Sequence, residues 1–449
     1  MNLLDCAYAL SIGPHYLYHR LVSGKYGPRA GEKTGRVPDR FKCSATAVMG
    51  TGDPHFEPPC LWVHAVSVGE AVACRDLVRL FMRDNPRWEV KFSVTTATGR
   101  SILEKEFGEE SVFYYPLDFS WMVKRSFDAI RPSMIMLMEL EIWPNFLAEA
   151  ERRAVPVVVA NARITERSVK RLSYVPSIAR RMANAVEEWF AQTQTYADRL
   201  EKIGVPSCRI EVTGSVKYDA VPADIDVAVG RYYRRLFGCG ERGYAEGGEL
   251  LVVGGSTHPT EEKTLLSALA EALPSGAARP RVVLAPRHPE RLDEVEREAS
   301  AFGTVVRRSA LAEPLPGVKW CGADIVLVDT MGELSKIYAA ADIVYIGGTM
   351  IPHGGQNFIE PCGLAKPTVV GPNVWNFSEP AELLGGEECL KTVRDGDELA
   401  VWLSGVIANP GDGRAMGEHA RRVLLKQRGA ARRMADRLKV LARCITRKH

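Results

Sequence analysis

The stretch Leu61-Trp62-Val63-His64-Ala65-Val66-Ser67-Val68-Gly69-Glu70, residues 61–70, decides the fold. Its apolar first half predicts a buried strand, its serine and glycine predict a turn, and a helical pattern follows at residues 71–82. The same succession of apolar run, small-residue turn and helix recurs along most of the chain. Strands that alternate with helices predict a parallel sheet covered on both faces, so the expected fold class is α/β.

The recurrences form two series with a break between them. We expect strands at residues 61–65, 90–94, 133–138, 155–160 and 210–212 in the first series, and at 250–253, 281–285, 325–328, 343–345 and 368–370 in the second. A proline and a run of glycines interrupt the pattern at 221–247, which predicts a linker. We therefore expect two Rossmann-like, doubly wound domains, 43–220 and 248–430, that face a central cleft where ligands bind. Residues 1–42 and 431–449 are expected to be terminal segments.

The composition is that of a globular protein. The 449 residues include 58 Lys and Arg against 55 Asp and Glu, and 46% of them are hydrophobic, which excludes a disordered or collagen-like chain. Ten cysteines are scattered without a C-x-x-C pair. Their spacing gives no zinc or redox site and favours a reducing cytoplasm.

Basic residues are concentrated at the two ends of the chain. Residues 421–449 hold eleven Lys and Arg against the single Asp436, and residues 1–42 hold seven against three Asp and Glu. Residues 1–22 are rich in apolar and aromatic side chains, but they contain no continuous apolar run of 18 or more residues that could span a bilayer. We therefore expect an interfacial segment there. Such ends suit a nucleic acid or an anionic membrane surface. A solvated terminal helix explains the last segment equally well.

Glu70 stands where the first expected strand gives way to a helix, at the edge of the sheet where ligands bind. A carboxylate in the first turn of a helix complements the helix dipole, which stabilises the helix by roughly 0.3–1 kcal/mol. The same carboxylate in a cleft can act as a general base. The spacing alone leaves both interpretations open.

Two further carboxylates follow the apolar run 134–138. Glu139 and Glu141 point to one side if the extended chain continues, because side chains alternate along a strand. Burying either carboxylate without a partner is costly, so we expect a cation, a substrate hydroxyl or a helix terminus to bind it. Pro144 favours the start of a helix, and we expect at least one of the two carboxylates to cap that helix.

Polar and cationic side chains follow several other expected strands. Arg163 and Lys217 come after strands of the first domain, and Arg287 follows a strand of the second. Several cations aimed at one cleft suit an anionic substrate. Gly254 and Gly255 allow a phosphate to approach the backbone closely. Neither a G-x-G-x-x-G fingerprint nor a P-loop occurs, so nicotinamide and ATP chemistry lose support.

The run Gly354-Gly355-Gln356-Asn357-Phe358-Ile359-Glu360-Pro361 combines a glycine pair with the start of a helix. Asn357 is a suitable N-cap, the first amides of the helix can hold a phosphate, and Glu360 can accept hydrogen bonds from ribose hydroxyls. An ordinary capping box explains the same residues. The two interpretations are compatible, because a capped helix can still donate its remaining N–H groups.

Seven ordered segments resemble the 3-deoxy-D-manno-octulosonic acid (Kdo) transferases of lipopolysaccharide assembly. They are HAVSVGE (64–70), MELEIWPN (138–145), NAR (161–163), TGSVK (213–217), APRHPER (285–291), DTMGEL (329–334) and GGQNFIEP (354–361). Seven segments in the same order along nearly the whole chain are far more specific than any single motif.

The resemblance implies a glycosyltransferase-B (GT-B) fold and an inverting transfer of Kdo from CMP-Kdo to a lipid A precursor, lipid IVA, with neither metal nor other cofactor. By this resemblance Glu70 is the general base, and Glu139 and Lys217 support the transition state. The residues that would surround CMP are Pro286, Arg287, Met331, Gly332, Glu333, Asn357, Phe358, Ile359 and Glu360. The enzyme would act at the cytoplasmic face of the bacterial inner membrane, with an anionic membrane surface and no nucleic acid as partner. One departure is Gln356, where the family commonly has a histidine.

The chemistry of an inverting transfer fits these residue types. One base takes the proton of the acceptor hydroxyl while the nucleotide departs from the opposite face of the sugar. Glu139 has the charge that suits a developing oxocarbenium ion, and Lys217 and Arg287 have the charge that suits a departing phosphate.

Three other functions fit parts of the sequence. The first is another GT-B nucleotide-sugar transferase with a lipid-linked acceptor, which would differ in its donor. The second is a nucleotide-sugar epimerase or hydrolase, which would need no lipid. The third is a non-catalytic protein that binds membranes or nucleic acid, which would leave Glu70 and Glu139 without a role.

Overall fold

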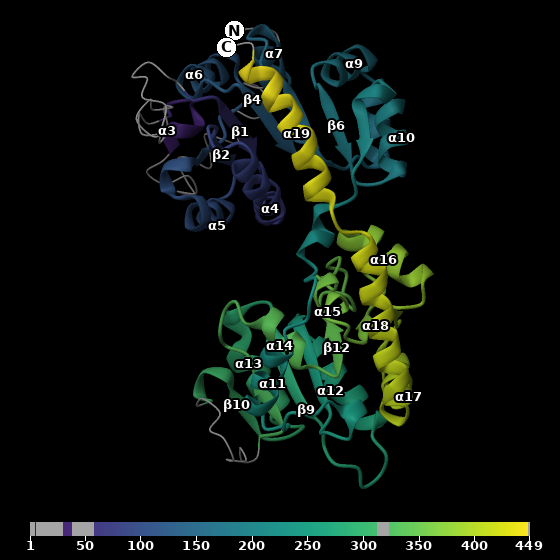
Figure 1. The fold of residues 1–449 in the computed structure, drawn as a ribbon. Helices are drawn as coiled ribbons and strands as arrows, with labels where there is room; N and C mark the ends of the chain where they lie inside the picture. Colours follow the sequence, from purple (N-terminus) through teal and green to yellow (C-terminus); the bar gives the residue numbers. More distant parts are fainter. Residues whose placement is uncertain (1–4, 6–29, 38–57, 312–322, 448–449) are drawn as a thin grey trace. The chain divides into compact units, whose positions relative to one another are not determined.

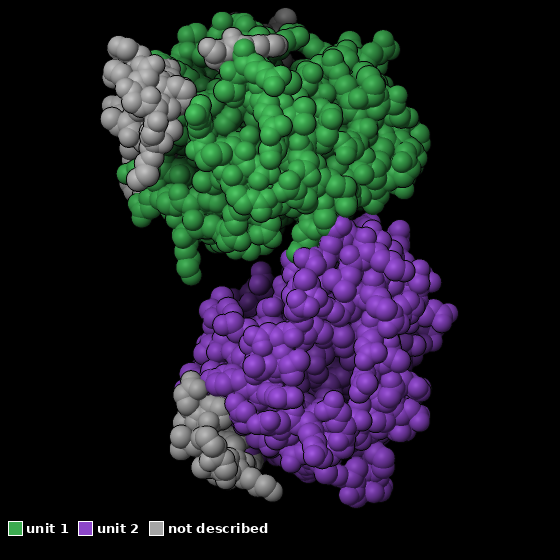
Figure 2. Space-filling model, in the orientation of Figure 1, with its two compact units in different colours: residues 1–219, 429–449 green, residues 220–428 purple. Residues whose placement is uncertain are grey.

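The computed structural model in Figure 1 describes residue 5 and residues 30–37, 58–311 and 323–447. The chain divides into two compact units, distinguished in Figure 2. Unit 1 comprises Met1–Asp219 and Gly429–His449, and unit 2 comprises Ala220–Arg428. Each unit holds a seven-stranded sheet whose neighbouring strands pair in parallel, which confirms the α/β class.

The sheet of unit 1 has the order β3-β2-β1-β4-β5-β6-β7. Its strands are β1 (Cys60–His64), β2 (Glu89–Val94), β3 (Val112–Tyr114), β4 (Met134–Met138), β5 (Val157–Ala162), β6 (Glu188–Ala191) and β7 (Ile210–Val212). Its helices are α3 (Ala30–Lys33), α4 (Val68–Asp84), α5 (Ala97–Phe107), α6 (Ser120–Ile130), α7 (Pro144–Arg152), α8 (Glu166–Ser173), α9 (Pro176–Asn184), α10 (Gln194–Lys202) and α19 (Ala430–Thr446).

Helices cover both faces of this sheet, which explains why its central strands are apolar throughout. Every residue of β1 and β4 is buried. On one face Trp62 packs against Phe127 of α6 and Phe146 of α7, with ring centroids 5.3 and 5.0 Å away. On the other face α4, α5 and α19 pack on the sheet. The carboxyl ends of the strands therefore form one edge that loops can use for ligands.

The sheet of unit 2 has the order β10-β11-β9-β8-β12-β13-β14. Its strands are β8 (Leu251–Thr257), β9 (Arg281–Pro286), β10 (Val305–Arg307), β11 (Ile325–Leu327), β12 (Ile343–Ile346), β13 (Thr368–Val370) and β14 (Lys391–Thr392). Its helices are α11 (Val227–Leu236), α12 (Glu261–Ala272), α13 (Leu292–Ala299), α14 (Leu334–Ala340), α15 (Ile359–Gly363), α16 (Ser378–Gly386), α17 (Gly396–Ala408) and α18 (Pro410–Lys426). Helices α12, α13 and α17 share one apolar core with the sheet.

The chain crosses between the units at places that differ from the expected boundaries. The segment expected as a linker, 221–247, contains α11 and belongs to unit 2, where Arg234 is buried and binds Asp342 at 2.7 Å. The C-terminal helix α19 belongs to unit 1. Its first turn donates to Asp219, whose carboxylate accepts from the amides of Gly429 (2.5 Å) and Ala431 (2.7 Å).

The sequence led to two expectations about membranes, an interfacial segment at residues 1–22 and the absence of a membrane-spanning segment. The expected interfacial segment, residues 1–22, lies outside the described residues except for residue 5. In the described ranges, none of the helices has the length and apolar character needed to cross a bilayer.

Candidate active site

Glu70 occupies the turn between β1 and α4, where a capping box holds it in place. Ser67 is the N-cap of α4 and accepts from the amide of Glu70 at 3.3 Å. In return, the Glu70 carboxylate accepts from the amide of Val66 and from the Ser67 hydroxyl, both at 2.9 Å. This is a variant of the S-x-x-E capping box, in which the carboxylate accepts from the amide of the residue before the N-cap. This fixed geometry orients the carboxylate at the carboxyl end of β1.

The electrostatic setting of Glu70 suits a base. Burial raises the pKa of Glu70 to about 7, and the nearby charges of Glu139 and Glu141 add to the rise, whereas the hydrogen bonds from Val66 and Ser67 oppose it. Burial also raises the pKa of Glu141, and Glu139 contributes in the same direction. A carboxyl group with a pKa near neutrality can take a proton and release it at physiological pH.

The chain turns at Glu139, so the expected alternation beyond β4 is wrong. Glu139 adopts a left-handed conformation with φ of +56°, which ends the strand, although its amide still donates to Ala160 of β5 at 2.9 Å. A non-glycine residue in this conformation is uncommon and costs free energy, and such residues gather at functional sites. Glu139 and Glu141 thus remain together near Glu70 without an extended chain between them.

Neither of these carboxylates caps the helix that begins at Pro144, contrary to expectation. The N-cap position of α7 is Trp143, which makes no side-chain capping bond. The buried carboxylate of Asp118 instead accepts from the amides of Asn145 (3.0 Å) and Phe146 (2.8 Å). A distant residue therefore satisfies the helix terminus, and Glu139 and Glu141 are left available to the site.

Lys217 belongs to the same edge of unit 1. The buried Asn161 side chain, near the carboxyl end of β5, accepts from the amide of Val216 at 3.2 Å. Asn161 has φ of +56°, and its side-chain nitrogen is buried without a hydrogen-bond partner. The segment with Lys217 is therefore attached to the end of β5, next to β4 and Glu139.

His64 completes this edge, and the sequence analysis assigned it no role. Its ring stacks on Tyr115 with centroids 3.8 Å apart, and its Nδ1 atom lies 3.0 Å from the carbonyl oxygen of Ser93. Burial lowers the pKa of His64 to about 4, so the ring is neutral. Nδ1 must then donate to the Ser93 carbonyl, which leaves Nε2 as a buried acceptor without a partner.

In unit 2 a single buried carboxylate organises the turn after β12. Glu261, in the first turn of α12, accepts from the amides of Gly348 (2.6 Å), Thr349 (3.0 Å) and Met350 (2.9 Å). It also accepts from the amide of His258 and the hydroxyl of Tyr345, both at 3.0 Å. The carboxylate thereby ties the loop after β8 to the loop after β12.

Three imidazoles gather at this edge of unit 2. The ring of His258 lies with its centroid 4.2 Å from that of His353 and 5.4 Å from that of His288. Burial lowers the pKa of His258, and the two neighbouring imidazoles act in the same direction. Gln356, the residue that departs from the family pattern, lies 3.2 Å from Nε2 of His258. In the described ranges no three His, Cys, Asp or Glu side chains are arranged to hold a metal ion.

The expected nucleotide-binding residues lie on loops at the same edge. Pro286 ends β9, and the amide of Arg287 donates to Thr257 at 2.9 Å while its side chain is exposed. Met331 is 85% exposed after β11, and Gly332 has φ of +82°. These residues are accessible to a ligand.

Glu333 already has partners in the described structure. It accepts from Tyr233 and Arg308, each at 3.0 Å, and from Thr330. Burial opposes its ionisation, but the hydrogen bonds from Thr330 and Tyr233 and the charge of Arg308 together hold the pKa of Glu333 below its usual range. A ligand that binds Glu333 would have to share it with these partners.

The run 354–361 is only partly exposed to a ligand. Asn357 accepts from the amide of Ile359 at 3.0 Å, and its side-chain amide donates to Glu360 at 2.9 Å. The N-cap position of α15 is nevertheless Phe358, without a side-chain capping bond, so the expected N-cap at Asn357 is wrong. Phe358 and Ile359 are buried. They can offer only backbone groups to a nucleotide. Burial raises the pKa of Glu360, against the hydrogen bond from Asn357.

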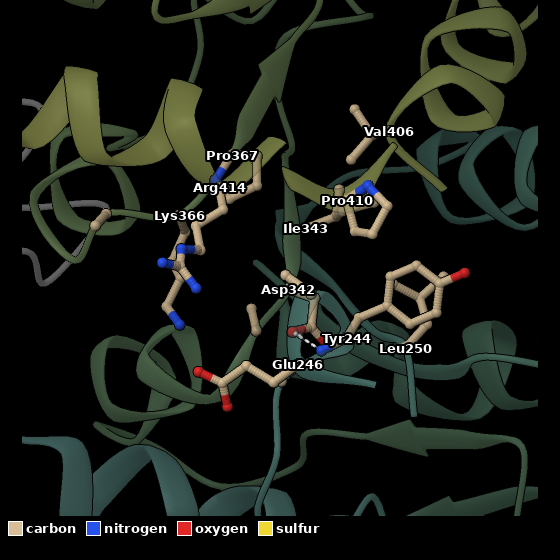
Figure 3. Close-up of a pocket in the computed structure, with 14 residues that line it drawn as sticks. Tyr244, Glu246, Leu250, Asp342, Ile343, Lys366, Pro367, Val406, Pro410 and Arg414 are labelled. Carbon is tan, nitrogen blue, oxygen red and sulfur yellow. Dashed lines mark hydrogen bonds between the residues drawn. The ribbon is translucent and has the colours of Figure 1, made fainter. Parts of the chain in front are cut away.

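A separate cavity of about 170 Å³ lies in unit 2, away from these loops (Figure 3). Leu250, Asp342 and Pro367, at or near the amino ends of their strands, are among its lining residues. Asp342 is held by Arg234 and by the amides of Tyr244 and Leu251, both at 2.9 Å. Since ligands of doubly wound sheets bind at the carboxyl ends of the strands, this cavity is not the expected site.

Solved structures of nucleotide-sugar enzymes share this fold. The crystal structure of HepE from Anabaena in complex with UDP matches 85% of this chain and 100% of that one, with a TM-score of 0.55 and 13% identity. A UDP-GlcNAc 2-epimerase from Neisseria meningitidis matches 82% of this chain and 99% of that one, with a TM-score of 0.53 and 14% identity. The two doubly wound units thus define the GT-B fold.

Sequence relatives identify the family within that class. The family described as 3-deoxy-D-manno-octulosonic-acid transferase (kdotransferase) matches residues 32–220. The 3-deoxy-D-manno-octulosonic acid transferase of Bordetella pertussis is 33% identical over 90% of this chain and 93% of its own length. That of Haemophilus influenzae is 29% identical over 85% and 87%. The chain belongs to the 3-deoxy-D-manno-octulosonic acid transferase family and is a glycosyltransferase.

Proposed function

We propose that this protein transfers Kdo from CMP-Kdo to a lipid A precursor with inversion, and that Glu70 is the general base. The observation that carries the proposal is the carboxylate at the end of β1, fixed by two hydrogen bonds and with a pKa of about 7. A base whose pKa lies near the working pH is both ionised often enough and basic enough to take the proton of a hydroxyl.

The neighbouring charges fit the rest of the transition state. Glu139, which lies close enough to raise the pKa of Glu70, can stabilise positive charge that develops on the sugar as the nucleotide departs. Lys217 follows β7 at the same edge and can bind an anionic group. CMP-Kdo has two anionic groups, the carboxylate of the sugar and the phosphate that links the sugar to CMP. Lys217 and Arg287 could therefore each bind one anionic group.

The loops of unit 2 suit the nucleotide. Arg287 provides a cation for a phosphate, and the three neighbouring histidines can provide N–H donors. Gly354 and Gly355, with φ of +100° and +85°, form the buried turn that leads into α15. Glu360 accepts a hydrogen bond from the Asn357 side chain and could also accept from ribose hydroxyls. No step in this scheme requires a metal, so EDTA should leave the rate unchanged.

The test incubates the purified protein with CMP-Kdo and a tetraacylated lipid A precursor, and measures both CMP release and the mass of the lipid. A gain of one or more Kdo units in the lipid supports the proposal. CMP release without a lipid product supports a hydrolase, and turnover with a UDP-sugar alone would contradict the donor assignment. Glu70→Gln should lower kcat by roughly 10²–10⁴-fold, whereas Glu110→Gln, an exposed carboxylate of the same unit, should not change it.

We also propose that the protein works at the cytoplasmic face of the inner membrane, where a lipid acceptor would be found. Residues 1–22, with their apolar and aromatic content, support such a location. Removal of these residues should weaken binding to anionic vesicles. It should also lower thermal stability, because it removes the buried carboxylate of Asp5, which accepts from the amide (2.8 Å) and the hydroxyl (2.6 Å) of Ser120, so vesicle binding is measured well below the unfolding transition. Unchanged vesicle binding at physiological salt would contradict an interfacial role for this segment.

A further inference from the structure

Helices α8 and α9 meet at an exposed apolar joint. Tyr174, Val175 and Ile178 are 74%, 41% and 43% exposed, and every residue from 173 to 178 is exposed. Packing against the core does not require these three side chains. Leu172, Ala179 and Met182, on the inner faces of the two helices, already make that contact. Single exposed apolar residues are ordinary, but three within five positions form a patch that favours an apolar partner.

Cations surround this joint. Arg167, Lys170, Arg171, Arg180 and Arg181 are all exposed, and Glu166 is the single acidic residue of the two helices. Arg181 lies 3.6 Å from Glu151. Among the described residues the other four form no ion pair. An apolar patch within a ring of unpaired cations complements a surface that is apolar inside and anionic at its boundary, which is the character of an anionic bilayer.

The C-terminal helix, by contrast, uses its cations within unit 1. Arg432 and Lys439 lie 3.2 and 3.7 Å from Asp84. Arg437 pairs with Glu188 and lies 3.4 Å from Glu211, and the Arg433 side chain donates to the carbonyl of Thr213 at 2.8 Å. Such exposed pairs stabilise little, and they offset part of the charge that makes this segment basic in sequence. Four of the five cations of α8 and α9 thus have no ion pair among the described residues, whereas four of the five cations of α19 contact groups of unit 1.

The joint is ordered before any partner binds. Thr165 caps α8 by accepting from the amide of Ser168 at 3.2 Å, and Pro176 is the first residue of α9. Between the helices, the amide of Val175 donates to Leu172 at 3.0 Å, and that of Ala179 donates to Val175 at 3.0 Å. Docking would therefore cost little additional backbone order.

This surface adjoins the carboxylate cluster through one loop. An apolar cavity of about 250 Å³ beneath the two helices is lined by Leu140 and Ile142, among others. These two residues alternate with Glu139 and Glu141 in the loop after β4. The two helices would thus stand between a membrane held against their exposed faces and the loop that contributes two of the three clustered carboxylates.

We propose that the α8–α9 surface, residues 166–181, docks unit 1 on an anionic lipid bilayer. Tyr174, Val175 and Ile178 enter the boundary between headgroups and acyl chains, and the surrounding cations bind lipid phosphates. The inference rests on the proposed function in one respect, since a lipid acceptor gives the docking its purpose. Binding to a bilayer is nevertheless a property of the surface itself and can be measured without any sugar donor.

The experiment measures sedimentation of the full chain with vesicles of phosphatidylcholine alone or mixed with phosphatidylglycerol. One variant combines Tyr174→Ser, Val175→Ser and Ile178→Ser. A second combines Arg167→Gln, Lys170→Gln and Arg180→Gln. The matched controls are Val401→Ser, which changes a side chain 75% exposed in unit 2, and the combination Lys105→Gln, Lys263→Gln and Arg297→Gln, three exposed cations elsewhere.

We expect each removed cation at the joint to lower affinity for anionic vesicles roughly fivefold, an effect that weakens at high salt. The serine variant should bind anionic vesicles at least tenfold more weakly, and the controls should bind like the unaltered protein. Thermal unfolding should be unchanged in all variants, because every altered side chain is exposed. Unchanged vesicle binding by both joint variants overturns the proposal, because another segment of the chain would then be responsible for lipid binding. Equal losses in the controls also overturn it.

A second readout separates this inference from the proposed function. Transfer to an acceptor embedded in anionic vesicles should fall in the joint variants, while transfer to the same acceptor dispersed in detergent should not. Equal transfer by all variants in vesicles would contradict the role of the surface in catalysis at a bilayer. A protein that binds vesicles through the joint but transfers no Kdo would instead contradict the proposed function alone.

Discussion

At the scale of single residues, Glu70 combines a structural role with the requirements of a base. Its carboxylate closes the first turn of α4, yet burial and two neighbouring carboxylates keep its pKa at about 7. Because only the ionised form can accept a proton, kcat/KM should fall about tenfold per pH unit below pH 7 and level off above it. Initial rates of CMP release between pH 5 and 9 would test this profile. A rate independent of pH across this range would exclude Glu70 as the base.

The same pKa makes a prediction about stability. Since the folded protein holds the proton of Glu70 up to about pH 7 and the unfolded chain releases it near 4.5, the folded state loses stability as the pH rises between these values. The unaltered protein should lose up to about 3 kcal/mol relative to Glu70→Gln across this window. Urea unfolding of both proteins at pH 5 and pH 8 gives the difference. Glu110→Gln, an exposed control, should follow the unaltered protein.

Glu261 is the residue on which the loops of unit 2 depend most. Its replacement by alanine would leave three turn amides, the amide of His258 and the hydroxyl of Tyr345 without their acceptor. We expect a loss of at least about 3 kcal/mol in unfolding free energy, because each buried orphaned donor costs about 1–3 kcal/mol, together with weaker CMP binding. Denaturant unfolding and calorimetry would measure both effects. Glu271→Ala, an exposed change at the far end of the same helix, should alter neither.

At the scale of elements, the strands that the sequence pattern predicted are those with continuous apolar runs. The expected strands 210–212 and 368–370 match β7 and β13, and the others are displaced by one to a few residues. The pattern missed β3, β10 and β14, which are short strands at sheet edges, and it also missed β6, a four-residue strand between β5 and β7. Edge strands contact a neighbour on one side only, and β14 is exposed along its length, so burial leaves little apolar signature in them.

Site residues were predictable where local spacing fixes them and missed where the partner is distant. The S-x-x-E spacing around Glu70 lies within four residues, so its signal was present in the sequence, although only the helix dipole and a general base were expected there. Asp118 caps α7 from 27 residues away in the chain, and Glu261 binds a turn 87 residues away. No pattern in a single sequence reports such pairs. The signal that was present for Glu261 is its place four residues after Thr257, at the end of β8.

Helix α19 illustrates the same limit and supports a prediction. Its apolar face, which includes the buried Met434 and Leu438, covers one face of the unit 1 sheet with α4. Met434→Ala should destabilise the protein by about 2–5 kcal/mol, the usual cost of truncating a buried large side chain. Val440→Ala, on a side chain that is 50% exposed in the same helix, should cost far less. Equal losses in denaturant unfolding would show that helix propensity, rather than packing, explains the contribution of α19.

At the scale of the whole molecule, the residues expected to bind the nucleotide and the clustered carboxylates belong to different compact units. Unit 2 has its own apolar core, and the residues expected around CMP all lie on its loops. Unit 1 contains the carboxylate cluster and the cationic surface of α8 and α9, and its last helix comes from the far end of the chain. The order of strands and helices in the sequence therefore predicts two similar domains, but it does not predict that the C-terminal helix packs in unit 1.

This division predicts that donor recognition is a property of unit 2 alone. Residues 220–428, expressed as a separate protein, should bind CMP with an affinity within a few fold of the full chain and should catalyse no transfer, because Glu70 and Glu139 are absent. Arg287→Ala should weaken CMP binding in both proteins about tenfold or more, since a charge-assisted hydrogen bond contributes about 1.5–3 kcal/mol. Arg297→Ala, an exposed arginine on α13, is the matched control and should change nothing. Calorimetric titration with CMP would measure all four affinities. A folded unit 2 that fails to bind CMP while the full chain binds it would mean that unit 1 supplies part of the nucleotide site.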